Sequence, residues 1–190
     1  MQKIIAIASS AGGPKALSIL LAGLHENFGS SVVVAQHIPD DFISGLVEWL
    51  NRESKIEVKR AEQGELLLPG TAYISPSIKH MTVDYSGRVA LKEKRPGDVY
   101  FPSCDLLLKS VADVFGPESI GVVLSGMGSD GMLGLKKIKA AGGATIAQDE
   151  KTAVIFGMPK VAIDNGCIDS VLPIEEISEK ILSLVGGEAP

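Results

Sequence analysis

Three side chains of the types used in nucleophilic hydrolysis follow three predicted strands. Ser10 follows the apolar run 4–8, and His37 follows the apolar run 32–35. Asp130 lies five residues after Ser125, which itself follows the apolar run 120–124. Ligands of an open α/β sheet bind at the carboxyl ends of its strands, so these side chains are expected at one edge. A hydroxyl, a base that takes its proton and a carboxylate that orients the base make up such a site. The order of residues therefore indicates a serine hydrolase. Three other aspartates are rivals of Asp130 for the role of the carboxylate: Asp40, Asp41 and Asp149.

The two glycines after Ala11 permit a tight turn from strand to helix behind Ser10. Such a turn exposes the hydroxyl and leaves backbone N–H groups free at the helix N-terminus. Serines before helices more often act as caps, which gives Ser9 and Ser10 a purely structural interpretation. Local chemistry does not choose between the two serines as nucleophile.

The glycine-rich segment 126–131 supports an alternative enzyme class. It matches G-x-G-x-x-G between a predicted strand and a predicted helix, and Asp149 ends the next strand where a dinucleotide enzyme holds the ribose. That fingerprint normally follows the first strand of its fold, and Asp130 would place a negative charge beside the pyrophosphate. A dinucleotide-binding oxidoreductase using Gly126–Gly131 and Asp149 is thus the alternative to the hydrolase.

The other reactive side chains give weaker signals. Cys104 stands at a predicted helix N-terminus, where the pKa of a thiol can fall, but a small buried core residue is the more common interpretation. Cys104 and Cys167 lack zinc-site spacing, and the histidines form no H-E-x-x-H pair. His25 and His80 are expected at the surface. No structural metal is predicted.

The elements that must position these residues alternate between short apolar strands and amphipathic helices. Strands are expected at 3–8, 32–35, 56–59, 120–124, 144–147 and 168–172, and helices at 14–24, 42–51, 103–114, 133–141 and 174–185. Residues 64–102 do not show this alternation. They are rich in the turn-forming residues Pro, Gly and Ser and contain a predicted hairpin at 81–84 and 89–91, so the segment is expected to be an antiparallel excursion from the parallel sheet. The alternation predicts an α/β fold: a doubly wound, mainly parallel sheet with helices on both faces.

Length and composition exclude several classes of protein. A chain of 190 residues favours one domain, 1–190, and its 18 basic against 23 acidic residues give a net charge of −5. With 5 Phe, 3 Tyr and 1 Trp, it lacks the basic stripe and stacking platforms of a nucleic-acid binder. Its apolar runs are too short for membrane insertion, and the first one is too short for a signal peptide. A cytoplasmic protein is expected.

Several spaced motifs resemble one known family. Residues 7–13 (IASSAGG), 36–39 (QHIP) and 124–131 (LSGMGSDG) resemble the nucleophile turn, the histidine segment and the aspartate loop of the chemotaxis receptor methylesterases, the catalytic domain of protein-glutamate methylesterase. Segments 68–74, 79–81, 102–105, 145–148 and 156–159 also follow that family's order. The resemblance extends from the first strand almost to the C-terminus.

The resemblance implies a mechanism and a set of site residues. Ser10, rather than Ser9, would be the nucleophile, His37 the general base and acid, and Asp130 its orienting carboxylate. The oxyanion would be held by backbone N–H groups of the aspartate loop and the nucleophile turn, which places Met127, Gly128 and Ala11 at the oxyanion and binding site. No cofactor or metal is implied.

The resemblance also implies the partners. The substrate would be a methylated glutamate on the cytoplasmic domain of a methyl-accepting chemoreceptor, with deamidation of receptor glutamines as a second reaction. Two residues depart from the family pattern: Ala11 replaces a common Thr, and Phe101 replaces a residue that is often basic. The family usually carries a regulatory receiver domain in cis, and nothing in 1–190 corresponds to one. The expectation is a monomeric catalytic domain, either excised or natural.

Overall fold

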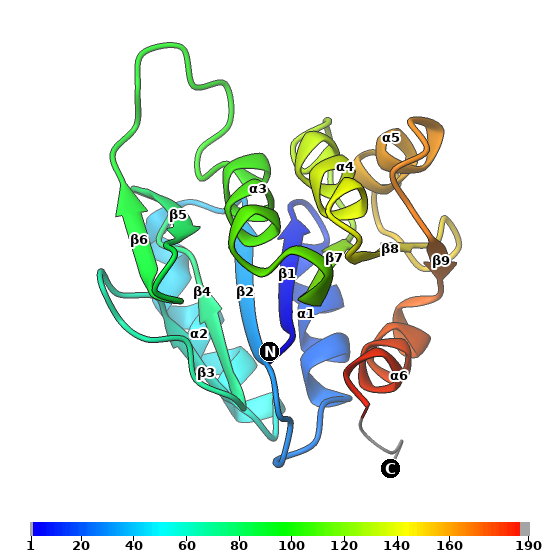
Figure 1. The fold of residues 1–190 in the computed structure, drawn as a ribbon, viewed down its shortest axis with the longest axis horizontal. Helices are drawn as coiled ribbons and strands as arrows, with labels where there is room; N and C mark the ends of the chain where they lie inside the picture. The colour runs from blue at the N-terminus through cyan, green and yellow to red at the C-terminus, as the bar shows by residue number, and fades with distance from the viewer. Residues whose placement is uncertain (1, 187–190) are drawn as a thin grey trace.

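The computed structural model describes residues 2–186 and contains a seven-stranded parallel sheet (Figure 1). The strand order is β3-β4-β2-β1-β7-β8-β9. The bounds are β1 (Ile4–Ser9), β2 (Ser31–Gln36), β3 (Glu57–Arg60), β4 (Thr71–Ile74), β7 (Ser119–Val123), β8 (Ala144–Gln148) and β9 (Ser170–Leu172). This confirms the predicted doubly wound α/β fold.

The central strand β1 shows why this sequence forms a two-sided sheet. All six of its residues are buried. Ile5 and Ile7 point into one hydrophobic cluster, and Ile4, Ala6 and Ala8 point into the other. Successive side chains of a strand face opposite sides, so a continuous apolar run fits a strand that is covered on both faces.

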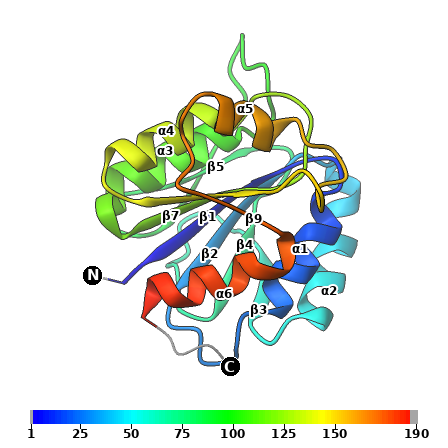
Figure 2. The ribbon, with the colours of Figure 1, turned by 90° about the vertical axis from the view of Figure 1, so that its right-hand side faces the viewer.

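Within residues 2–186, six α-helices cover the two faces of the sheet (Figure 2). One face carries α1 (Gly13–Ala22), α2 (Ile43–Glu53) and α6 (Ile174–Val185), and the other carries α3 (Cys104–Phe115), α4 (Met132–Ala140) and α5 (Met158–Asp164). Short 3-10 turns, η1 (Asp40–Phe42) and η2 (Gly116–Glu118), precede α2 and β7. The sequence patterns located every helix except α5, a two-turn helix whose pattern is too short to show a period.

The segment expected to be an antiparallel excursion requires a correction. Within 64–102, β4 pairs in parallel with both β2 and β3 and belongs to the main sheet. All four β4 residues are buried, and this burial selects a parallel strand despite the Leu68-Pro69-Gly70 turn before it. Only β5 (His80–Val83) and β6 (Val89–Lys92) form the predicted antiparallel hairpin, which packs over α3.

The strand order places the candidate site residues together. From β1 the chain proceeds to β2 on one side of the sheet and later returns to β7 on the other side of β1. The carboxyl ends of these three strands therefore border a topological switch point, where ligands of open α/β sheets bind. Ser10, His37 and the loop 125–131 follow directly after them.

Candidate active site

The register of β1 and β2 brings Ser10 next to His37. Ser9 and Gln36 are partners at the ends of these strands, and the His37 N–H donates to the Ser9 carbonyl at 3.0 Å. On its other side, Ser10 donates its N–H to the carbonyl of Ser125 at 3.0 Å. Ser10 is thus held between the histidine segment and the loop after β7.

The two serines have different surroundings. The Ser9 side chain is fully buried, and its hydroxyl donates to Gln36 Oε1 at 2.6 Å. Ser10 is partly exposed. The N-cap of α1 is Gly12, with φ of 80° and no side-chain hydrogen bond, so the interpretation of these serines as helix caps is wrong. Of the two hydroxyls, that of Ser10 is the one open to a substrate.

His37 and Asp130 form a close pair at the edge of the sheet. His37 Nε2 lies 2.9 Å from Asp130 Oδ2, and the Asp130 side chain is buried. The N–H groups of Cys104 and Asp105, at the start of α3, donate to the same carboxylate at 2.6 and 2.9 Å. Burial disfavours the charged form, but the hydrogen bonds from His37 and these N–H groups outweigh it and lower the pKa of Asp130.

Only one of the two ring nitrogens of His37 is used in the pair with Asp130. Nε2 forms the hydrogen bond with Asp130, whereas Nδ1 has no hydrogen-bond partner within residues 2–186. A neutral imidazole that donates from Nε2 has an acceptor lone pair on Nδ1. The ring of Tyr100 stacks on His37, with centroids 5.7 Å apart and an interplanar angle of 2°. No sequence signal pointed to Tyr100.

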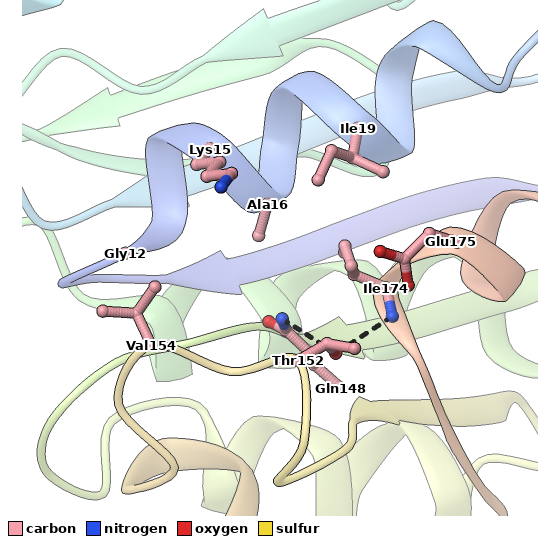
Figure 3. Close-up of a pocket in the computed structure, with 9 residues that line it drawn as sticks. All are labelled: Gly12, Lys15, Ala16, Ile19, Gln148, Thr152, Val154, Ile174 and Glu175. Carbon is pink, nitrogen blue, oxygen red and sulfur yellow. Dashed lines mark hydrogen bonds between the residues drawn. The ribbon is translucent and has the colours of Figure 1, made fainter.

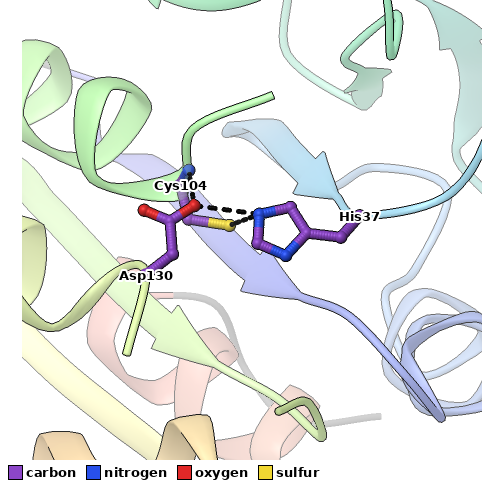
Figure 4. A group of neighbouring side chains, drawn as sticks. All are labelled: His37, Cys104 and Asp130. Carbon is purple, nitrogen blue, oxygen red and sulfur yellow. Dashed lines mark hydrogen bonds and ion pairs between the residues drawn. The ribbon is translucent and has the colours of Figure 1, made fainter. Parts of the chain in front are cut away.

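Cys104 lies against the same pair (Figure 4). Its Sγ is 3.5 Å from His37 Nε2, and the side chain is fully buried. Burial raises the pKa of this thiol well above its ordinary value, and the Asp130 charge acts in the same direction. A protonated thiol is a weak nucleophile, so Cys104 is the buried core residue that was the preferred prediction.

The aspartate loop 125–131 packs directly on Ser10. A Cβ added to Gly126 would lie 2.8 Å from Ser10 Cβ, and one on Gly128, where φ is 100°, would lie 3.0 Å from the Tyr100 hydroxyl. Glycine is needed at both positions for this close approach. The Ala11 and Met127 N–H groups have no acceptor within the described chain, and the Met127 side chain is 69% exposed.

The geometry does not support the dinucleotide alternative. Asp105 Oδ1 accepts the N–H groups of Gly131 and Gly134, at 3.0 and 2.7 Å, and so occupies the α4 N-terminus where a pyrophosphate would bind. Asp149 instead accepts the N–H and hydroxyl of Thr152, at 3.0 and 2.6 Å. The glycine loop has a different task, which is to carry Asp130 to His37.

Comparison with known proteins gives one consistent result. The family model for CheB methylesterase matches residues 5–181. The chain belongs to the CheB methylesterase family. Protein-glutamate methylesterase/protein-glutamine glutaminase 3 of Paramagnetospirillum magneticum is 48% identical over 98% of this chain and 54% of its own length. Protein-glutamate methylesterase FrzG of Myxococcus xanthus is 43% identical over 96% of this chain and 54% of its own.

A solved structure agrees with these sequence relatives. The CheB methylesterase catalytic domain of Thermotoga maritima superposes with a TM-score of 0.93 at 38% identity, covering 97% of this chain and 99% of that one. The chain spans about half the length of the curated relatives it matches. Its similarity is thus to the catalytic part of CheB proteins.

In this CheB-family chain, His80 contradicts its predicted surface position. Its side chain is buried: Nε2 lies 2.9 Å from Asp98 Oδ2, and Nδ1 accepts the Ser103 N–H at 3.0 Å. The Phe101 ring packs edge-on against it, with centroids 4.7 Å apart. His80 thereby anchors the loop that carries Tyr100 over His37. His25, in the turn after α1, is partly exposed.

A pocket of about 210 Å³ lies beside the nucleophile turn (Figure 3). Gly12 and Val154 border its end near Ser10, and Gln148 and Thr152 form its wall. Gln148 Oε1 also accepts the Ser125 N–H at 2.8 Å, which ties this wall to the aspartate loop. The wall of this pocket and the aspartate loop of the candidate active site are therefore held together by the same hydrogen bond.

Asp105 provides a test of how the aspartate loop is held. Asp105→Ala leaves the Gly131 and Gly134 N–H groups without their acceptor, so we expect a loss of about 2 kcal/mol in unfolding free energy. Asp105→Asn keeps one oxygen for both donors and removes a charge that burial disfavours, since burial raises the pKa of Asp105. We expect it to stay within about 1 kcal/mol of the parent. Urea unfolding of both variants measures the difference; equal losses would contradict this role.

Proposed function

We propose that this chain hydrolyses methyl esters of glutamate side chains on the cytoplasmic domains of chemoreceptors. The proposal rests on the pair of His37 and the buried Asp130, 2.9 Å apart, beside a partly exposed Ser10 at the end of the adjoining strand. The names of the relatives, protein-glutamate methylesterases, supply the substrate class.

In this mechanism Ser10 Oγ attacks the γ-carbonyl carbon of the ester. His37 Nδ1 takes the hydroxyl proton as the C–O bond forms, and then gives it to the departing methoxide, so that methanol leaves. A water molecule, deprotonated by His37, hydrolyses the acyl-enzyme and releases glutamate. Asp130, ionised at neutral pH, holds the ring and stabilises its positive charge during each transfer.

The backbone around Ser10 is suited to bind the developing oxyanion. The N–H groups of Met127 and Ala11 come from the two segments that meet at Ser10, and neither is used elsewhere in residues 2–186. Such a donor contributes roughly 10²–10³-fold to the rate of acyl transfer. Gly128 is proposed to serve the site by keeping the loop close to Tyr100.

Related reactions and partners follow from the same chemistry. Deamidation of receptor glutamines proceeds by the same steps with ammonia as the leaving group, and several relatives are named protein-glutamine glutaminases as well. None of the helices within residues 2–186 has the length and the apolar character that a membrane span requires. We place the reaction in the cytoplasm, where these receptor domains lie, and assign 1–190 as a catalytic domain that a receiver domain in cis can regulate.

Methanol release from membranes that contain methylated chemoreceptors tests this function. We expect release that exceeds both a no-enzyme blank and a reaction with unmethylated membranes. A folded protein that releases no methanol from several receptors would contradict the proposal.

Asp149→Ala separates the hydrolase from its alternative. The Asp149 carboxylate bonds only to Thr152 among the residues whose contacts are described. We therefore expect this variant to keep its rate of methanol release within about threefold, since it touches no group that acts on the ester. A loss of more than tenfold would show that the Asp149 turn contributes to the site.

A further inference from the structure

A second chemistry arises where His37, Cys104 and Asp130 meet. One ligand atom from each residue, the His37 Nε2, the Cys104 Sγ and an Asp130 carboxylate oxygen, lies within 4.8 Å of the other two. Figure 4 shows the three side chains converging from β2, α3 and the loop before α4. The proposed ester hydrolysis uses His37 and Asp130 but leaves the thiol without a task.

We propose that these three residues form an inhibitory site for a thiophilic divalent cation, Zn²⁺ being the best match. Zinc is bound by Cys, His and carboxylate ligands, and many sites use three protein ligands with a fourth position open. The softness of the thiolate favours Zn²⁺ over Mg²⁺ or Ca²⁺, which prefer oxygen ligands. That binding blocks catalysis rests on the proposed function.

The distances suit a tetrahedral zinc ion. Bond lengths near 2.3 Å to sulfur and 2.0 Å to nitrogen place these two ligands about 3.5 Å apart. The Cys104 Sγ to His37 Nε2 distance is 3.5 Å. The His37 Nε2 to Asp130 Oδ2 distance of 2.9 Å has to open to about 3.3 Å, a displacement that side-chain rotation provides.

The charges and the access route fit the same ion. A thiolate, a carboxylate and a neutral imidazole together cancel the charge of Zn²⁺, so no net charge is buried. Asp130 keeps the N–H donor of Asp105, at 2.9 Å, as an outer support. Tyr100, Ser103 and Asp130 are among the residues that line a surface pocket of about 210 Å³, so this pocket reaches one of the three ligand residues.

Metal binding moves two protons. The Cys104 thiol releases its proton to solvent as the Zn–S bond forms. On His37, the metal takes the Nε2 lone pair, and the ring proton moves from Nε2 to Nδ1. A protonated Nδ1 has no lone pair to accept the proton of Ser10, so the metal-bound enzyme lacks its general base.

Cobalt and zinc titrations of the metal-free full chain test this site. Co²⁺ should give the near-ultraviolet absorption of a cobalt–thiolate bond, which vanishes in Cys104→Ala and Cys104→Ser. Zn²⁺ binding, measured against a chromogenic chelator, should weaken at least tenfold in both variants, as expected for loss of a ligand. Cys167→Ala, which removes a thiol that is also buried, is the matched control and should behave like the parent.

The activity measurement completes the test. Zn²⁺ should inhibit methanol release by the parent and Cys167→Ala at concentrations at least tenfold lower than for Cys104→Ala, each compared with its own zinc-free rate. A parent protein without the thiolate band, or equal zinc affinity in Cys104→Ala, overturns the metal site. The cobalt spectrum needs no substrate, so failure of methanol release overturns only the proposed function.

Discussion

Ser10→Ala is expected to lower the rate of methanol release by about 10⁴–10⁶-fold, as expected for loss of the nucleophile of a triad. The substitution removes the attacking oxygen and nothing else, because no hydrogen bond of the Ser10 side chain contributes to the described structure. We therefore expect unchanged thermal unfolding. The measurement is methanol release from methylated receptor membranes, with the unfolding temperature recorded on the same sample.

Ser9→Ala is the matched control for that experiment. It also deletes one hydroxyl, but from a buried side chain that donates to Gln36 Oε1 at 2.6 Å. Loss of this hydrogen bond should cost about 1 kcal/mol in unfolding free energy and leave at least a tenth of the activity. The two serines thus have opposite expected phenotypes. A Ser9→Ala variant that is stable but inactive, beside an active Ser10→Ala variant, would reverse the assignment of the nucleophile.

Most of this fold could be predicted because its strands are buried on both faces. The strands Ile4–Ser9 and Ser119–Val123 are buried along their whole length and are apolar apart from one serine each, and helical periodicity fills segments between the strands. The prediction failed where a strand was too short to show a pattern, or where its pairing was decided by tertiary structure. Thr71–Ile74 has only four residues, and its parallel pairing is decided by β2 and β3 on either side. Nothing in the local sequence contains that information.

The candidate site was predictable to the extent that strand ends meet at one edge. That rule brought Ser10, His37 and Asp130 together, and the structure places them after β1, β2 and β7. It could not supply the neighbours that come from the hairpin and α3. Tyr100 stacks on His37, and Cys104 contacts it, only because the loop after β6 folds back over the sheet. Such contacts depend on the path of a loop, which no periodic pattern records.

Asp130→Asn is expected to reduce the rate of methanol release by about 10⁴-fold, because an amide cannot hold the His37 tautomer that a carboxylate selects. Both carboxylate oxygens accept hydrogen bonds here: Oδ2 from His37 and Cys104, and Oδ1 from Asp105. In Asp130→Asn one of these two oxygens becomes an NH₂ group, which cannot accept a hydrogen bond from the donors that faced that oxygen. The buried donors left unpaired should cost about 1–3 kcal/mol in unfolding free energy.

The pH dependence of stability gives a second measurement on this variant. The pKa of Asp130 is lowered in the folded protein, so the unfolded chain binds this proton first as the pH falls. The ionised carboxylate therefore stabilises the fold fully above about pH 4, the ordinary pKa of Asp, and loses that contribution as the pH drops towards its folded value. The difference in unfolding free energy between the parent and Asp130→Asn should be constant from pH 5 to 7 and shrink below about pH 4. Urea unfolding across this range measures it. A difference that does not change with acidification would show that Asp130 does not depend on the His37 and α3 donors for its charge.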